Sequence, residues 1–135
     1  MLMALWPAWA QETIGFVKTV TGKAAVTDAG KLIDAQVGTP IKMGNILKTG
    51  PQATMGVTFK DNTVMSFGPD TEITVDEYLY APGKGDLKFS TSMAKGSMQV
   101  VSGVIAKLKP QAVTVKTQGG LIGCRGTRFL VKVEP

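Results

Sequence analysis

Turn-forming residues interrupt this chain about every 8 to 12 positions, a spacing typical of sandwiches, barrels and solenoids of short strands. Sixteen glycines and seven prolines among 135 residues supply most of these breaks. Between the breaks, apolar and polar residues alternate with period two, which predicts half-buried β-strands. We expect strands over residues 14–20, 23–27, 31–36, 45–49, 54–60, 71–77, 97–101 and 129–133, with further strands around Met65, Phe89 and Val115.

Two hairpins are expected from the local turn chemistry. The clearer one joins the strand over residues 54–60 to the strand around Met65, and Asp61-Asn62 supplies a two-residue turn. Both turn residues tolerate the positive φ that such turns require. The other hairpin would pair the first two strands across Thr21-Gly22. Residues 102–109 follow neither the helical nor the strand period clearly.

The end of the chain is a glycine-rich turn followed by an alternating strand. The turn carries Arg125-Gly126-Thr127, and the strand places Phe129, Val131 and Val133 on the face opposite Arg128, Leu130 and Lys132. The preceding strand is expected to contain Val113 and Val115. The whole pattern predicts an all-β fold, a single domain of many short antiparallel strands arranged as a solenoid or a sandwich. The rung-like spacing favours the solenoid.

The residue types exclude most catalytic chemistry. There is no histidine, which removes His-dependent nucleophilic catalysis and His-based metal sites. Glu72 and Asp76 share a strand face about 13 Å apart at ~3.3 Å per residue, farther than the paired carboxylates of glycosidases. The glycines at 120, 123 and 126 lack the strand-then-helix context of a nucleotide cradle. We therefore expect no enzyme activity, no cofactor and no metal.

The formal net charge of +5 has two interpretations. It serves solubility, or it attracts anionic envelope polymers or lipid headgroups. The lysines are scattered without a basic run, so nucleic acid is not an expected partner. Cys124 is the single cysteine and cannot form an internal disulfide. Its glycine-rich surroundings favour a buried small residue over a nucleophile.

Residues 1–10 indicate a signal peptide rather than part of the fold. The run is apolar and uncharged, and it ends in Ala8-Trp9-Ala10, the small-x-small pattern of a signal peptidase site. Cleavage after Ala10 would start the mature chain at Gln11 and remove both tryptophans. No other segment has the ~18 apolar residues that span a bilayer, so stable membrane insertion of the mature form is not expected.

Six short motifs, in order, make the chain resemble the FecR domain, a bacterial envelope domain of sensory regulators. The resemblance covers residues 14–133 and begins with a glycine-containing strand pair. The later motifs are Gly44-Asn45-Ile46-Leu47-Lys48-Thr49-Gly50, Asp61-Asn62, Gly68-Pro69-Asp70-Thr71-Glu72-Ile73, Gly96-Ser97-Met98-Gln99-Val100, and Thr117 with Arg125-Gly126-Thr127-Arg128-Phe129. Members of that family often carry an acid where this chain has Asn45.

The resemblance implies an all-β envelope domain without catalytic residues. In full-length regulators a cytoplasmic anti-sigma segment and a membrane helix precede the domain, and because neither is found here we expect a free-standing periplasmic version. The motif residues are expected to be structural: Thr49, Gly50, Asp61, Asn62, Gly68, Pro69, Thr71, Arg125, Gly126, Thr127 and Phe129. For Arg125, a structural role is favoured over binding a carboxylate or phosphate ligand: it would pair with a carboxylate such as Asp61, Asp70 or Glu72, or cap loop carbonyls.

These observations lead to one functional hypothesis and one alternative. The first is a non-enzymatic exported domain that contacts another protein during envelope sensing or assembly, with exposed strand edges as the route of contact. The alternative is a binding module for an anionic envelope glycan or lipid headgroup. The oligomeric state is left open.

Overall fold

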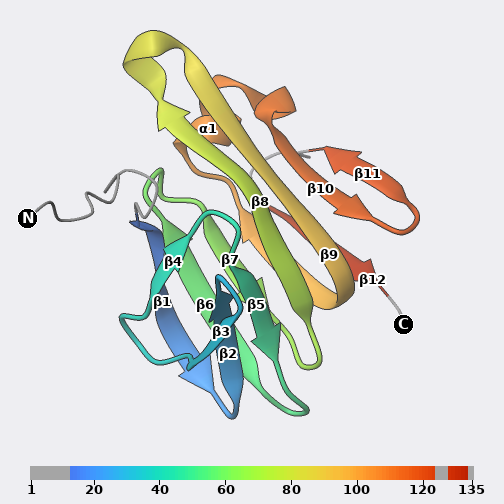
Figure 1. Cartoon of the computed structure of the whole chain (residues 1–135). Helices are drawn as coiled ribbons and strands as arrows, with labels where there is room; N and C mark the ends of the chain where they lie inside the picture. Colours follow the sequence, from blue (N-terminus) through green and yellow to red (C-terminus); the bar gives the residue numbers. More distant parts are fainter. Residues whose placement is uncertain (1–12, 124–127, 134–135) are drawn as a thin grey trace, which may run out of the picture.

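The computed structural model describes residues 13–123 and 128–133, and its elements are almost all strands (Figure 1). In these residues the order is β1 (Thr13–Thr21), β2 (Ala24–Asp28), β3 (Lys31–Asp34), β4 (Pro40–Lys42), β5 (Ile46–Thr49), β6 (Thr54–Phe59), β7 (Val64–Phe67), β8 (Glu72–Ala81), η2 (Pro82–Lys84), β9 (Asp86–Val101), α1 (Val104–Leu108), η3 (Pro110–Ala112), β10 (Val113–Thr117), β11 (Gly120–Gly123) and β12 (Arg128–Val133). Of the described helices, none has the length and apolar content to cross a bilayer.

The strands form one curled sheet, which we describe as two parts joined by β9. Sheet A runs in the order β4, β1, β6, β7, the second half of β9, and β12. Sheet B runs in the order β3, β2, β5, β8, the first half of β9, β10 and β11. Every described pairing is antiparallel except that of β9 with β10. The predicted all-β class of many short antiparallel strands is therefore confirmed.

The long strand β9 is the element that both parts share. Its first half pairs with β8 in sheet B, and its second half pairs with β7 and β12 in sheet A. Gly96 lies between the two halves, and its φ of +103° is a backbone conformation that residues other than glycine rarely adopt. The predicted strand over residues 97–101 is thus the end of a strand that begins at Asp86.

The inner faces of both sheets bury one apolar core. Alternating residues of sheet A and of sheet B belong to the same cluster, and an aromatic group of Phe59, Tyr78 and Phe89 lies within it. The ring centroids are 4.7 to 5.6 Å apart, within the range that favours aromatic pairs. The largest fully buried side chains are Phe89, Ile41, Leu47, Met55, Met65, Ile73, Met93, Met98 and Ile105.

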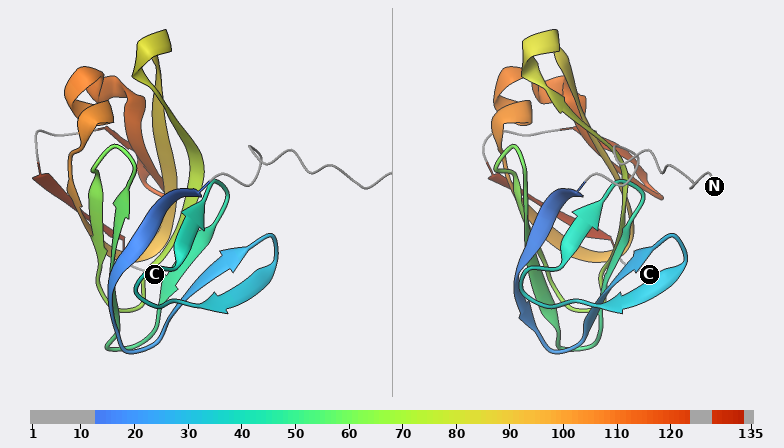
Figure 2. Two further views of the ribbon diagram at one scale, coloured as in Figure 1. Left: turned by 90° about the vertical axis from the view of Figure 1, so that its left-hand side faces the viewer. Right: turned by 60° about the vertical axis from the view of Figure 1, so that its left-hand side comes forward.

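The predicted hairpin of the first two strands is wrong. β1 pairs with β4 and β6, while β2 pairs with β3 and β5. Val17 of β1 and Val26 of β2 are both completely buried, but on different parts of the sheet. The turn at Gly22 therefore carries the chain from sheet A to sheet B, and the hairpin of β2 and β3 stands out at one side (Figure 2).

The preference for a solenoid is also wrong. In a β-solenoid, the strands of successive coils pair in parallel. Among the described strands, β9 and β10 form the single parallel pair. The regular turn spacing that suggested rungs instead comes from hairpins and from crossings between sheets A and B. This arrangement is closer to the sandwich.

Three local expectations also need correction. The Phe59 N–H donates to the Thr63 carbonyl, so the hydrogen bond before β7 encloses a loop of three residues, 60–62, instead of the expected two. Of the expected turn pair Asp61-Asn62, only Asn62 has positive φ. Such loops combine a turn with one left-handed residue. The ambiguous segment contains the short helix α1. The strand holding Val113 and Val115 is not the penultimate one, because β11 follows it within the region expected to be a turn.

Candidate functional site

Five of the predicted motif residues meet at the end of β5 and the β7–β8 turn. The Thr49 hydroxyl donates to the Gly68 carbonyl at 2.6 Å and accepts the Thr71 N–H at 2.9 Å. Gly50 joins the same corner, since its carbonyl accepts the Asp70 N–H at 3.1 Å. Pro69 forms part of the turn between them. The sequence motifs around residues 49 and 69, which are separate in the chain, are thus one connected structure.

Thr71 extends this corner to the bend in β9. Its hydroxyl lies 2.8 Å from the Gly68 carbonyl and 3.2 Å from the Ser97 carbonyl, and it accepts the Ser97 N–H at 3.1 Å. A Cβ added to Gly96 would come within 2.6 Å of the Thr71 Cβ and closer still to its Cα. The bend of β9 and the β7–β8 turn therefore fit together only with glycine at position 96.

A second cluster of buried polar contacts is centred on Asp61, a motif residue that is completely buried. Its carboxylate accepts the Tyr78 hydroxyl at 2.9 Å, the Thr63 hydroxyl at 2.8 Å and the Ile105 N–H at 3.0 Å. Its carbonyl accepts the Val104 N–H at 2.8 Å. Asp61 therefore satisfies the start of α1, where no side chain of the helix's own N-cap does so.

Tyr78 completes this network from β8. Its hydroxyl also accepts the Asp61 N–H at 2.9 Å. Burial of the phenol, and then the neighbouring Asp61 carboxylate, raise the pKa of Tyr78 above its usual value, so the neutral form is strongly favoured. The network holds a neutral tyrosine and contains no base exposed to a substrate. Its role is to tie the β6–β7 loop, β8 and α1 together.

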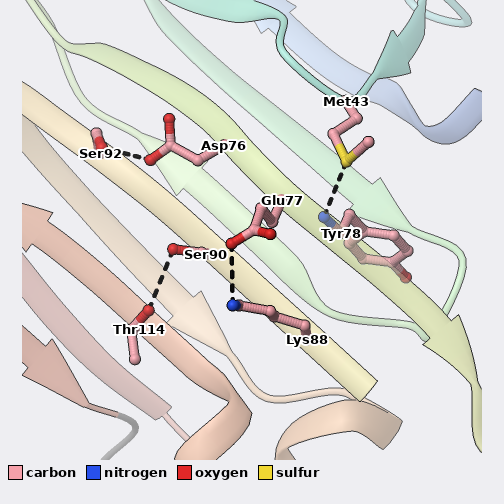
Figure 3. Close-up of polar contacts among 8 residues, drawn as sticks. All are labelled: Met43, Asp76, Glu77, Tyr78, Lys88, Ser90, Ser92 and Thr114. Atoms are coloured by element: carbon pink, nitrogen blue, oxygen red, sulfur yellow. Dashed lines mark hydrogen bonds and ion pairs between the residues drawn. The ribbon is translucent and has the colours of Figure 1, made fainter. Parts of the chain in front are cut away.

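The three carboxylates of β8 are engaged with residues of the adjacent strands β5 and β9, and the contacts of Asp76 and Glu77 are drawn in Figure 3. Glu77 forms an ion pair with Lys88 at 3.1 Å, Glu72 pairs with Lys48 at 3.6 Å, and Asp76 accepts the Ser92 hydroxyl. The Ser90 and Thr114 hydroxyls are 3.3 Å apart beside them. In the part of the chain that the structure describes, no group of three His, Cys, Asp or Glu residues is arranged to hold a metal ion.

The outer face of sheet A carries a shallow hollow of about 420 Å³ that crosses it from β1 to β12. Its floor is a row of small or flexible residues that the strand register places side by side, and Leu130 at the β12 end is 75% exposed. That row consists of Thr19, Gly56, Ser66, Gln99 and Leu130.

Charge is distributed unevenly between the two sheets. The described strands of sheet A other than β9 carry no acidic residue, whereas sheet B holds Asp and Glu on β2, β3, β8 and the start of β9. On β12, Arg128 and Lys132 share the face of Leu130, because strand residues two apart point the same way. Among the described strands, basic residues therefore outnumber acidic residues on sheet A, whereas on sheet B the acidic residues are largely balanced by lysines.

Comparison with protein families gives one match, to the FecR protein family over residues 45–135. The match spans more than half of the chain. This chain belongs to the FecR family. That family takes part in transmembrane signalling and in the regulation of sigma factors. Neither the curated proteins nor the solved structures contain a significant match.

The FecR match begins at β5 and leaves β1 to β4 outside it, although the resemblance was expected from residue 14. The unmatched strands are nonetheless part of the same sheet, since β1 pairs with β6 and β2 pairs with β5. The strands outside the matched residues and those inside them therefore form one sheet.

Asn45 is the residue at which the resemblance leads us to expect an acid, and the structure gives a reason for the amide. Asn45 is buried, its Oδ1 accepts the Lys42 N–H at 2.8 Å, and its Nδ2 donates to Asp28 at 2.9 Å. An aspartate would place a second carboxylate against Asp28 with no proton to share. An amide can donate there and a carboxylate cannot.

The remaining predicted residues divide into two groups. Phe129 lies on β12, is partly buried against the core and pairs with Val100. Cys124, Arg125, Gly126 and Thr127 lie outside the described residues, so the two interpretations of Arg125 stay predictions. Sequence reasoning missed Tyr78, Val104 and Ile105 as partners of Asp61. The Asp-x-Thr pattern at residues 61–63 was the available signal, because Asp side chains often bond the backbone two residues on.

Proposed function

We propose that this FecR protein is a non-enzymatic domain of the cell envelope that binds another protein during sensing or assembly. The observation that carries the proposal is the outer edge of sheet A. β12 pairs with β9 on one side, and no other described strand pairs with it. A strand edge presents unpaired N–H and C=O groups that an extended partner segment can use.

Export to the periplasm is part of the same proposal. It rests on the apolar stretch that ends at Ala10 and on the envelope location of the family's sensory domains. In the mature form, residues 11–135 would constitute the folded domain. The lack of activity is supported by Asp61, which is buried in a structural network, and by the three carboxylates of β8, which are paired with lysines or a serine.

The test is cross-linking of the tagged full-length protein in growing cells, with fractionation and mass spectrometry on one sample. We expect a mature N-terminus at Gln11 and one reproducible envelope protein in the cross-linked product. An unrelated exported domain with the same tag is the matched control. An uncleaved cytosolic product would refute the localisation, and a cleaved product without a protein partner would refute the interaction role.

The charge distribution favours a second candidate, a binding module for an anionic glycan or lipid headgroup. Sheet A combines a basic edge with a shallow polar hollow. Attraction between exposed charges is screened over ~8–10 Å at physiological salt. Binding to anionic vesicles or cell-wall polymers should therefore weaken as salt is raised, and binding that is independent of salt would exclude this candidate.

A further inference from the structure

Met43, in the turn between β4 and β5, differs in exposure from the other methionines of the described chain. Its exposed fraction is 57%, whereas Met55, Met65, Met93 and Met98 are each at most 2% exposed. Oxidants in solution therefore have direct access to the Met43 sulfur, and they have access to the other four sulfurs only when the fold opens. The four buried methionines belong to the core and provide an internal comparison.

The Met43 sulfur is also in contact with the main chain of β8. The Tyr78 N–H donates to this sulfur at 3.4 Å (Figure 3). The pairing of β5 with β8 ends at Thr74, and the register of β8 with β9 shifts between Val75 and Glu77. Beyond that shift, the thioether accepts a hydrogen bond that a neighbouring strand would otherwise accept. Because a thioether is a weak acceptor, this contact is a weak point at the edge of β8.

Two backbone hydrogen bonds hold the turn against β8 beside Met43. The Gly44 N–H donates to the Val75 carbonyl at 2.7 Å, and the Val75 N–H donates to the Asn45 carbonyl at 2.9 Å. Since the main chain is fixed at these points, a chemical change at the Met43 sulfur acts on its contact with Tyr78. Tyr78 is also the β8 member of the buried hydrogen-bond network described above.

We propose that Met43 is a site of reversible methionine oxidation, and that oxidation transfers the Tyr78 N–H from sulfur to the sulfoxide oxygen. With hydrogen peroxide as the oxidant, a sulfur lone pair attacks one peroxide oxygen. The S–O bond forms as the O–O bond breaks, and the second oxygen leaves as water with both protons. The sulfoxide oxygen is a stronger hydrogen-bond acceptor than the thioether, and enzymatic reduction restores the thioether.

The first test needs no partner protein. The folded full-length chain is treated briefly with hydrogen peroxide, digested after Lys and Arg, and analysed by mass spectrometry. Met43 and the four buried methionines each fall in a different peptide. We expect sulfoxide at Met43 to form at least about tenfold faster than at the buried positions, because those react only through opening. In urea the five rates should become similar. Five equal rates in the folded protein would overturn the proposed site.

The second test follows the Tyr78 amide by two-dimensional NMR of the isotopically labelled protein. Peroxide should move this signal downfield, as a stronger acceptor does, and a methionine sulfoxide reductase should return it. In Met43→Leu the Tyr78 amide should exchange faster with solvent, and peroxide should leave its signal in place. Met93→Leu, which replaces a buried methionine, is the matched control and should respond to peroxide as the unsubstituted protein does.

Two results would refute the link between Met43 and β8. One is oxidation at Met43 that leaves the Tyr78 signal unchanged. The other is an equal shift of that signal in Met43→Leu, which would assign the response to another residue. Because both tests use the purified protein alone, neither result depends on the protein-binding role proposed above.

Discussion

The polar residues of this protein behave in opposite ways in its interior and on the outer face of sheet A. Asp61 and Thr71 are almost completely buried, and their polar atoms are engaged by several partners from distant strands. The charged residues of β12 lie on the surface beside a shallow hollow. The motif residues Thr49, Asp61 and Thr71 therefore build the scaffold, whereas the charged residues of β12 remain on the surface.

Among the buried positions, Gly96 should give the largest loss of stability when it is substituted. In Gly96→Ala, the new Cβ would overlap the backbone of Thr71, and the backbone would be strained at φ +103°. We expect a loss of unfolding free energy of about 4 kcal/mol or more, enough to unfold many small domains. Urea denaturation followed by circular dichroism measures it. Gly83→Ala is the control, since a Cβ there meets nothing within 4 Å.

Asp61→Ala should be the next most damaging change. It would leave the Ile105 N–H and the Tyr78 and Thr63 hydroxyls without their acceptor in a dry site. We expect a loss of about 3 kcal/mol, because each buried unsatisfied group carries a desolvation cost. Asp86→Ala, at an exposed strand start, is the comparison in the same denaturation experiment. Similar small losses in both variants would argue against the network as a source of stability.

The pH dependence of stability should report on Tyr78. The pKa of its phenol is raised in the folded protein, so the folded state keeps a proton that the unfolded state releases near pH 10. Stability should therefore be unaffected below pH 10 and fall by up to ~1.4 kcal/mol per pH unit above it. In Tyr78→Phe this alkaline loss should be smaller. An identical alkaline profile would assign the loss to other groups.

Thr91→Val should stabilise the protein, in contrast to the substitutions at Gly96 and Asp61. The Thr91 hydroxyl is buried and, unlike those of Thr49, Thr63 and Thr71, has no hydrogen-bond partner among the described residues. Replacing it with a methyl group of similar size should raise the unfolding free energy by about 1 kcal/mol. The midpoint of urea denaturation should rise without a change in slope. The same substitution at Thr71 should lower it.

The smallest effect on stability is expected at the outer face. Arg128→Gln with Lys132→Gln should change the unfolding free energy by less than about 0.5 kcal/mol, because both side chains are exposed. The thermal midpoint measures this. A large loss would show that β12 needs these charges for folding, and the contrast between interior and surface would disappear.

The sequence by itself determined the class of this protein and its local structure. Period-two alternation placed most strands and their buried faces correctly, since each side of a strand alternates along the chain whatever its neighbour is. The six motifs made the chain resemble the FecR domain, and the family match over residues 45–135 confirms the family. Asp61, Thr49 and Thr71 were recognisable as motif residues.

Only the tertiary structure decided which strands pair and what the polar residues contact. Val17 and Val26 have the same local pattern, yet β1 and β2 enter different parts of the sheet. Asp61 is adjacent to a turn in sequence but buried against Tyr78 and the start of α1. Strand pairing and buried hydrogen bonds depend on groups far apart in the chain, and the alternation that predicts a strand is the same for every partner that the strand could have.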